Sequence, residues 1–79
     1  MYDPKVETYE DAENLIRSSE STVEMLHDRY LSASKELVKA QQYLYRMKDT
    51  KDEDLTKEMI SKIKFCTFIV EDIYESFEK

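Results

Sequence analysis

A single apolar periodicity, which runs from Tyr9 to Met47, constrains the fold of this chain more than any other feature. In alternating steps of three and four residues, eleven of its twelve positions are apolar. The twelve positions are Tyr9, Ala12, Ile16, Ser19, Val23, Leu26, Tyr30, Ala33, Leu37, Ala40, Leu44 and Met47. This spacing forms the a/d seam of helices that pack lengthwise against one another. The pattern therefore predicts an all-α fold.

The composition supports this fold class, because the 79 residues include no glycine and one proline, Pro4. Hairpin turns, phosphate-binding loops and β-bulges depend on glycine, so sheet folds and nucleotide-binding loops are disfavoured. We expect one helical domain, residues 1–79, although a lone core of this size is marginally stable. Cys66 is the only cysteine, which excludes an intrachain disulfide. Oligomerisation or docking on a partner is the expected source of further stability.

Capping signals predict a long helical hairpin, with a first helix over about 4–48 and a second over about 52–78. Asp3 and Pro4 suit the N-cap and first position of the first helix, and Thr8 with Asp11 offers a second start. The stretch Asp49–Asp54 lacks apolar residues and contains the capping box of Thr50 and Glu53. A bend in that stretch separates the two helices.

A three-helix bundle, with a break near Ser19–Ser21, is the alternative. Residues 17–22 are poor in helix formers, and Ser21 with Glu24 makes another capping box. The apolar spacing nevertheless continues through Ser19 without a change of phase. That continuity favours the hairpin.

The unequal lengths of the two predicted helices lead us to expect a homodimer. Folded back, the second helix would cover the first only from about residue 22 onward, at about 1.5 Å per residue. The seam from Tyr9 to Ser19 would then face water. A further apolar stripe, Leu31, Val38 and Tyr45, gives the first helix a second face. Two hairpins would bury the overhanging seam and the back of the second helix as an antiparallel four-helix bundle.

Two phenylalanines of the second helix are the strongest candidates for contact with another chain. Phe65 and Phe68 lie about 140–200° round the helix from the seam positions Ile63 and Val70, at about 100° per residue. Their neighbour is therefore either a second protomer or a target protein. The complete predicted interface is Tyr9, Ile16, Val23, Phe65, Phe68 and Ile69.

No motif for catalysis, a cofactor or a metal stands out in the sequence. Glu24 and His27 form a Glu-x-x-His pair, which di-iron bundles use on two helices. However, His27 is the only histidine, and Glu24 lies beside the seam rather than in it. Cys66 occupies a seam position, where a cysteine behaves as a small buried hydrophobe. We therefore expect a protein that is not an enzyme and holds no cofactor or metal.

The charge pattern excludes nucleic acid as the main partner, because phosphate contacts need a basic surface and the net charge is −6. Residues 1–28 hold eight acids and two bases, whereas residues 29–64 hold nine bases and six acids. The N-terminus lacks the pattern of a secretory signal, and no apolar stretch is long enough to span a membrane. A cytoplasmic protein without a membrane partner is expected.

These features together favour a non-enzymatic protein–protein interaction module. No protein family is recognised in the sequence. The apolar helix faces lead us to expect an adaptor or inhibitor that binds another protein through them. Small, acidic, glycine-free helical proteins of this kind include phage factors that bind host machinery, so a phage-type inhibitor of a host factor is one form of this expectation. A structural subunit of a larger coiled-coil assembly is the alternative, and a metal-binding four-helix bundle ranks below it.

Overall fold

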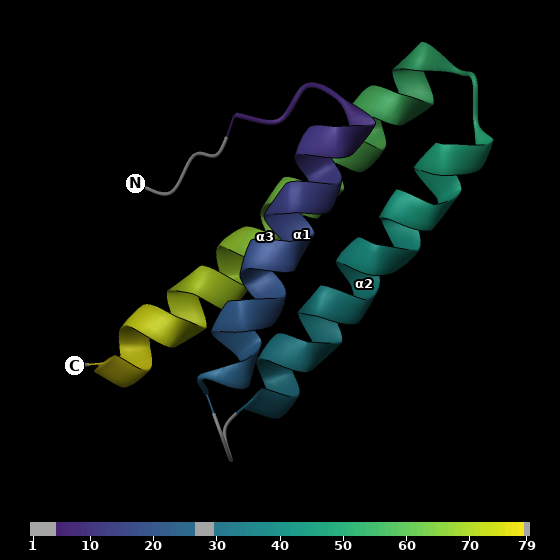
Figure 1. Cartoon of the computed structure of the whole chain (residues 1–79). Helices are drawn as coiled ribbons and strands as arrows, with labels where there is room; N and C mark the ends of the chain where they lie inside the picture. The colour runs from purple at the N-terminus through teal and green to yellow at the C-terminus, as the bar shows by residue number, and fades with distance from the viewer. Residues whose placement is uncertain (1–4, 27–29, 79) are drawn as a thin grey trace.

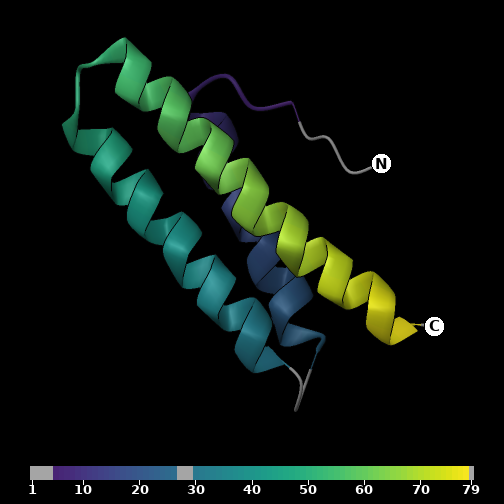
Figure 2. The ribbon, with the colours of Figure 1, turned by 180° about the vertical axis from the view of Figure 1, so that it is seen from behind.

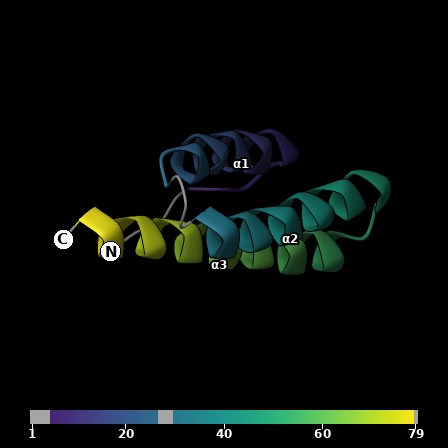
Figure 3. The ribbon, with the colours of Figure 1, turned by 90° about the horizontal axis from the view of Figure 1, so that it is seen from below.

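Three helices make up the regular structure of the part of the chain that the computed structural model describes, residues 5–26 and 30–78. They are α1 (Tyr9–Glu24), α2 (Tyr30–Asp49) and α3 (Glu53–Glu78). α2 and α3 run antiparallel and side by side, and α1 lies on one face of that pair (Figures 1 and 3). On the opposite side α2 and α3 lie in front of α1 (Figure 2). The all-α class is therefore confirmed, and the three-helix alternative fits.

The prediction of one continuous helix over 4–48 is wrong. α1 ends at Glu24, where the Met25 N–H donates to the Thr22 carbonyl and the Leu26 N–H donates to the Val23 carbonyl, each at 3.1 Å. α2 begins only at Tyr30. The break of the three-helix alternative lies a few residues further along the chain than Ser19–Ser21, which is inside α1. Apolar spacing alone could not separate these alternatives, because two consecutive helices can use the same phase.

α1 folds back because its apolar seam would otherwise face water, as it would in a continuous first helix. Ile16 is 3% exposed and Val23 is 8% exposed within the single chain. Burial of a large apolar side chain contributes about 1.5–3 kcal/mol. The chain thus covers its own N-terminal seam from Ala12 onward, and only Tyr9 at its start stays exposed. The overhang that motivated the homodimer is therefore absent.

The core lies between all three helices, and small residues hold several of its layers. Its members are Val6, Ala12, Leu15, Ile16, Val23, Leu26, Ala33, Leu37, Ala40, Met47, Met59, Ile63, Cys66 and Val70. Ala12, Ala33 and Ala40 are completely buried, and Ser19 is 5% exposed. Because these side chains are short, the helix backbones can approach closely while larger neighbours fill the space between them.

The starts of α1 and α3 are fixed by side-chain caps. Thr8 is the N-cap of α1, and its Oγ1 accepts from the Asp11 N–H at 3.2 Å. This is the second of the two predicted starts, Thr8 with Asp11. In α3 the cap is Asp52 rather than the predicted Thr50. The Asp52 carboxylate accepts from the N–H groups of Asp54 and Leu55 at 2.9 and 3.2 Å.

Even α3, which is the most apolar helix, is interrupted by charged side chains along its whole length. Among the helices of residues 5–26 and 30–78, none combines the length and apolarity that crossing a membrane would require.

We predict that Ala40→Leu destabilises the protein by about 1–3 kcal/mol, because the layer around Ala40 has no room for a larger side chain. Urea unfolding followed by circular dichroism measures this change. Ser32→Leu, at an exposed position of the same helix, is the control and should change stability by no more than about 0.5 kcal/mol. Equal stability of the two variants would contradict close packing at Ala40.

We also predict a pH dependence from the cap of α1. The hydrogen bond from the Glu7 N–H, with those from Thr8, holds the pKa of Asp11 below its ordinary value of 3.8. A carboxyl with a lowered pKa stabilises the fold above its unfolded pKa, and this contribution disappears as the pH falls through the folded pKa. When the pH falls from about 5 to about 2, the free energy of unfolding of wild type should therefore decrease more than that of Asp11→Asn. Urea unfolding at intervals of about one pH unit measures this difference. Parallel stability profiles of the two proteins would show that the Asp11 carboxylate contributes nothing to the capping box of α1.

Candidate protein-interaction surface

The six residues predicted to contact another chain fall into two groups in the structure. Phe65 and Phe68 are 64% and 42% exposed, and Tyr9 is 36% exposed. Ile69 is half-buried. Ile16 and Val23 lie in the core formed by the three helices. The structure thus brings Phe65, Phe68 and Ile69 together on α3 and leaves the three others on α1.

Ile16 and Val23 require a correction, because within the single chain they already pack into its own core. Their assignment to an interface depended on the uncovered half of a continuous first helix. Since α1 folds onto α2 and α3, both side chains are buried before any partner binds. They are not retained in the candidate surface.

Phe65 and Phe68, with Ile69 at their edge, form what we call the aromatic patch. The side of α3 that carries Ile63 and Val70 is buried, at 0% and 1% exposure. At about 100° per residue, Phe65 and Phe68 point away from that side. Two phenylalanine rings therefore stand in solvent one turn apart, on a helix whose other side is anchored in the core.

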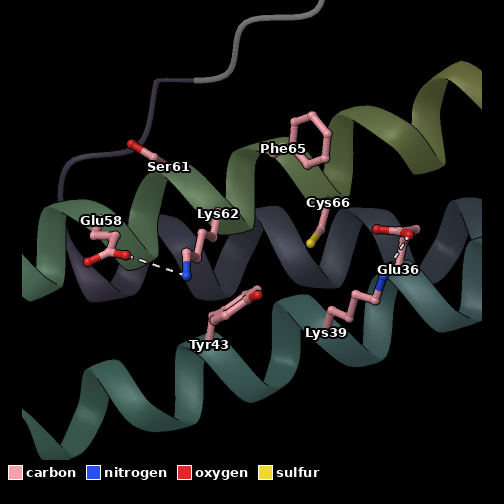
Figure 4. A pocket seen from close by; sticks show the side chains of 8 residues that line it. All are labelled: Glu36, Lys39, Tyr43, Glu58, Ser61, Lys62, Phe65 and Cys66. Atoms are coloured by element: carbon pink, nitrogen blue, oxygen red, sulfur yellow. Dashed lines mark hydrogen bonds and ion pairs between the residues drawn. The ribbon is translucent and has the colours of Figure 1, made fainter.

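A groove between α2 and α3 adjoins the aromatic patch and has a volume of about 450 Å³. Its lining residues are Glu36, Lys39, Tyr43, Glu58, Ser61, Lys62, Phe65 and Cys66. Figure 4 shows α1 behind this groove, the Cys66 sulfur pointing toward α2, and the Phe65 ring pointing away from α2. The groove thus lies on the face of the α2–α3 pair that α1 leaves uncovered.

The charged side chains of the groove are paired with one another. Lys39 Nζ lies 3.2 Å from Glu36 Oε1, and Lys62 Nζ lies 3.4 Å from Glu58 Oε1. Lys62 also reaches from α3 to α2, where its Nζ is 5.2 Å from the centre of the Tyr43 ring. This distance permits a cation–π contact. With two acids and two bases, the groove is electrically balanced on a chain of net charge −6.

The Cys66 thiol at the floor of the groove is held in its neutral form. Burial raises the pKa of Cys66 above its ordinary value of 9.0, and the neighbouring Glu36 carboxylate raises it further. A cysteine nucleophile needs the opposite, a pKa lowered by a cation or a base. The groove therefore offers an apolar floor with an aromatic edge rather than a reactive thiol.

The Glu24–His27 pair, the weakly favoured metal site, lies only partly within the described residues. Glu24 is exposed at the end of α1, and His27 falls outside the described residues. Over residues 5–26 and 30–78, no three side chains of His, Cys, Asp or Glu gather in a way that could hold a metal ion.

The sequence does not predict the groove, because the walls of the groove come from two helices whose relative rotation the sequence does not give. The apolar spacing placed Cys66 correctly in the α3 seam. For the wall that α2 provides, the sequence gives a partial indication at Tyr43. This residue directly precedes the seam position Leu44 and so lies at the margin of the α2 core face.

We predict slow modification of Cys66 in the folded protein. Because the thiol is buried and its pKa is raised, alkylation by iodoacetamide at pH 8 should be about tenfold or more slower than in the urea-unfolded chain. Mass spectrometry of timed samples measures the two rates. Equal rates would mean that the floor of the groove is open to solvent.

Comparison with known proteins gives no assignment for this surface: no protein-family model, curated protein or solved structure matches the chain.

Proposed function

We propose that this chain is a non-enzymatic protein–protein interaction module, an adaptor or inhibitor that binds another protein through the aromatic patch. The observation that carries the proposal is the exposure of Phe65 and Phe68, 64% and 42%, beside a groove of about 450 Å³. Aromatic side chains are enriched among the residues that dominate protein–protein binding. A partner would cover both rings and extend into the groove.

The rigidity of the patch supports this proposal. Both rings project from a helix of 26 residues whose opposite side carries Ile63, Cys66 and Val70 in the core. A phenylalanine has few side-chain torsions, so little conformational entropy is lost when a partner immobilises it. The partner gains the burial of two rings without the cost of ordering a loop.

The chemistry of the groove supports a binding role over a catalytic one. Its lysines are paired with glutamates, and its thiol has a raised pKa. A reaction would need a side chain with a pKa matched to its role as nucleophile, acid or base. The proposal also places the protein in the cytoplasm, where a single cysteine stays reduced.

A homodimer is the second candidate, and it now has a different basis. Two copies could pair through the faces of α2 and α3 that α1 leaves uncovered. Because Glu36 and Glu58 are balanced by Lys39 and Lys62, this pairing would bring no excess of like charge together. Such a dimer would bury both aromatic patches, but it would leave α1 on the outside.

We predict that Phe65→Ser combined with Phe68→Ser weakens partner binding by about tenfold or more, because truncated aromatic anchors lose their buried area. The partner is first trapped in cells that naturally produce the chain, with a photoreactive benzophenone amino acid in place of Phe65. Binding of the purified partner is then measured by calorimetry. Sedimentation of the same variant tests the homodimer.

The matched control has the benzophenone in place of Met25, the C-cap residue of α1, which is 57% exposed and does not line the groove. Cross-links specific to position 65, lost binding in the double variant and an unchanged circular dichroism spectrum are expected. The proposal is wrong if the double variant binds the trapped partner and self-associates as wild type does.

A further inference from the structure

A second outward surface lies on α2 and is distinct from the aromatic patch. Leu31, Val38 and Tyr45 are 64%, 49% and 70% exposed. They are spaced by seven residues and so follow one side of the helix. Ala33, Ala40 and Met47 bury the opposite side in the core. We call these three exposed side chains the α2 outer stripe.

The stripe has the form of a helix-docking seam. Val38, Gln41, Gln42 and Tyr45, with Arg46 beside them, surround a hollow of about 410 Å³. The first four are positions i, i+3, i+4 and i+7 of one helix. These are the four positions that form the hole for a knob from a facing helix in coiled-coil packing. The geometry of the hollow therefore fits a helix as its occupant.

The charges beside the stripe indicate the chemistry of that helix. Lys35, Gln42 and Arg46 follow one another along one side of it, and α2 as a whole carries four bases and two acids in a chain of net charge −6. The ion pairs among the described residues involve neither Lys35 nor Arg46. Within α2, Asp49 is the acid in line with the stripe, one turn beyond Tyr45. On the side of the hollow away from Lys35, the Glu20 carboxylate of α1 accepts from Gln41 Nε2 at 2.9 Å.

We infer that the α2 outer stripe binds an amphipathic helix of another protein, with apolar knobs seven residues apart and acidic residues along the edge that faces Lys35 and Arg46. Opposite charges at the edge of a helix–helix seam set partner choice and orientation. The same edge opposes pairing of α2 with α2 of a second copy, because it would bring like charges together.

Synthetic helical peptides of about three heptads test this inference. Three peptides share one leucine stripe and differ only in its flanks, which are Glu, Gln or Lys. Fluorescence anisotropy with the full chain should show the Glu peptide binding about tenfold or more tightly than the Lys peptide. Val38→Ser combined with Tyr45→Ser should weaken the Glu peptide by about tenfold, since the hollow loses two walls.

Charge reversal separates edge recognition from a general charge effect. Lys35→Glu combined with Arg46→Glu should reverse the order of the Glu and Lys peptides. Lys5→Glu combined with Lys57→Glu changes the net charge equally at exposed positions away from the stripe, and should preserve the order. Phe65→Ser combined with Phe68→Ser should leave peptide binding unchanged, so this inference and the proposed function can fail separately.

Several results would overturn the inference. One is equal binding of all three peptides, or binding of none of them. Another is self-association of the wild type that Val38→Ser with Tyr45→Ser abolishes, because the stripe would then be covered by a second copy. A third is binding to vesicles of anionic phospholipid that the same double variant loses, which would make the stripe a membrane contact.

Discussion

The close approach of three helices at small side chains is the interaction on which the rest of the structure depends. Ala12 of α1 and Ala33 and Ala40 of α2 are completely buried. Their short side chains allow α1 to lie directly on the α2–α3 pair, and larger residues such as Ile63 fill the core beside them. Because α1 occupies one face of the pair, the groove and the aromatic patch remain on the side that it does not cover.

The sequence predicted the helices better than their arrangement. The seam and the capping signals located α3 to within about one residue at each end, which is the usual uncertainty of a helix boundary. They did not locate the end of α1 at Glu24, because Val23, Leu26 and Tyr30 continue the apolar spacing across the turn. Periodicity reports which side of a helix is apolar, and it contains no information about where two helices with the same phase separate.

The candidate surface was predictable only where it depends on a single helix. The angle of Phe65 and Phe68 to the α3 seam follows from helix geometry alone, so their exposure could be anticipated. The groove requires the relative rotation of α2 and α3, which places Tyr43 beside Lys62. Ile16 and Val23 illustrate the same limit, because their burial depends on the position of α1 and not on their own spacing.

The aromatic patch and the α2 outer stripe lie outside the core that stabilises the fold. Phe65, Leu31 and Tyr45 are each 64% exposed or more, so their side chains contribute little buried area to the folded monomer. A small domain has little stability to spare, and exposed apolar area promotes unwanted association. Folding of the monomer therefore does not account for large apolar side chains at these positions. In the proposals above, they serve binding, because a partner would convert the exposed area into affinity without changing the core.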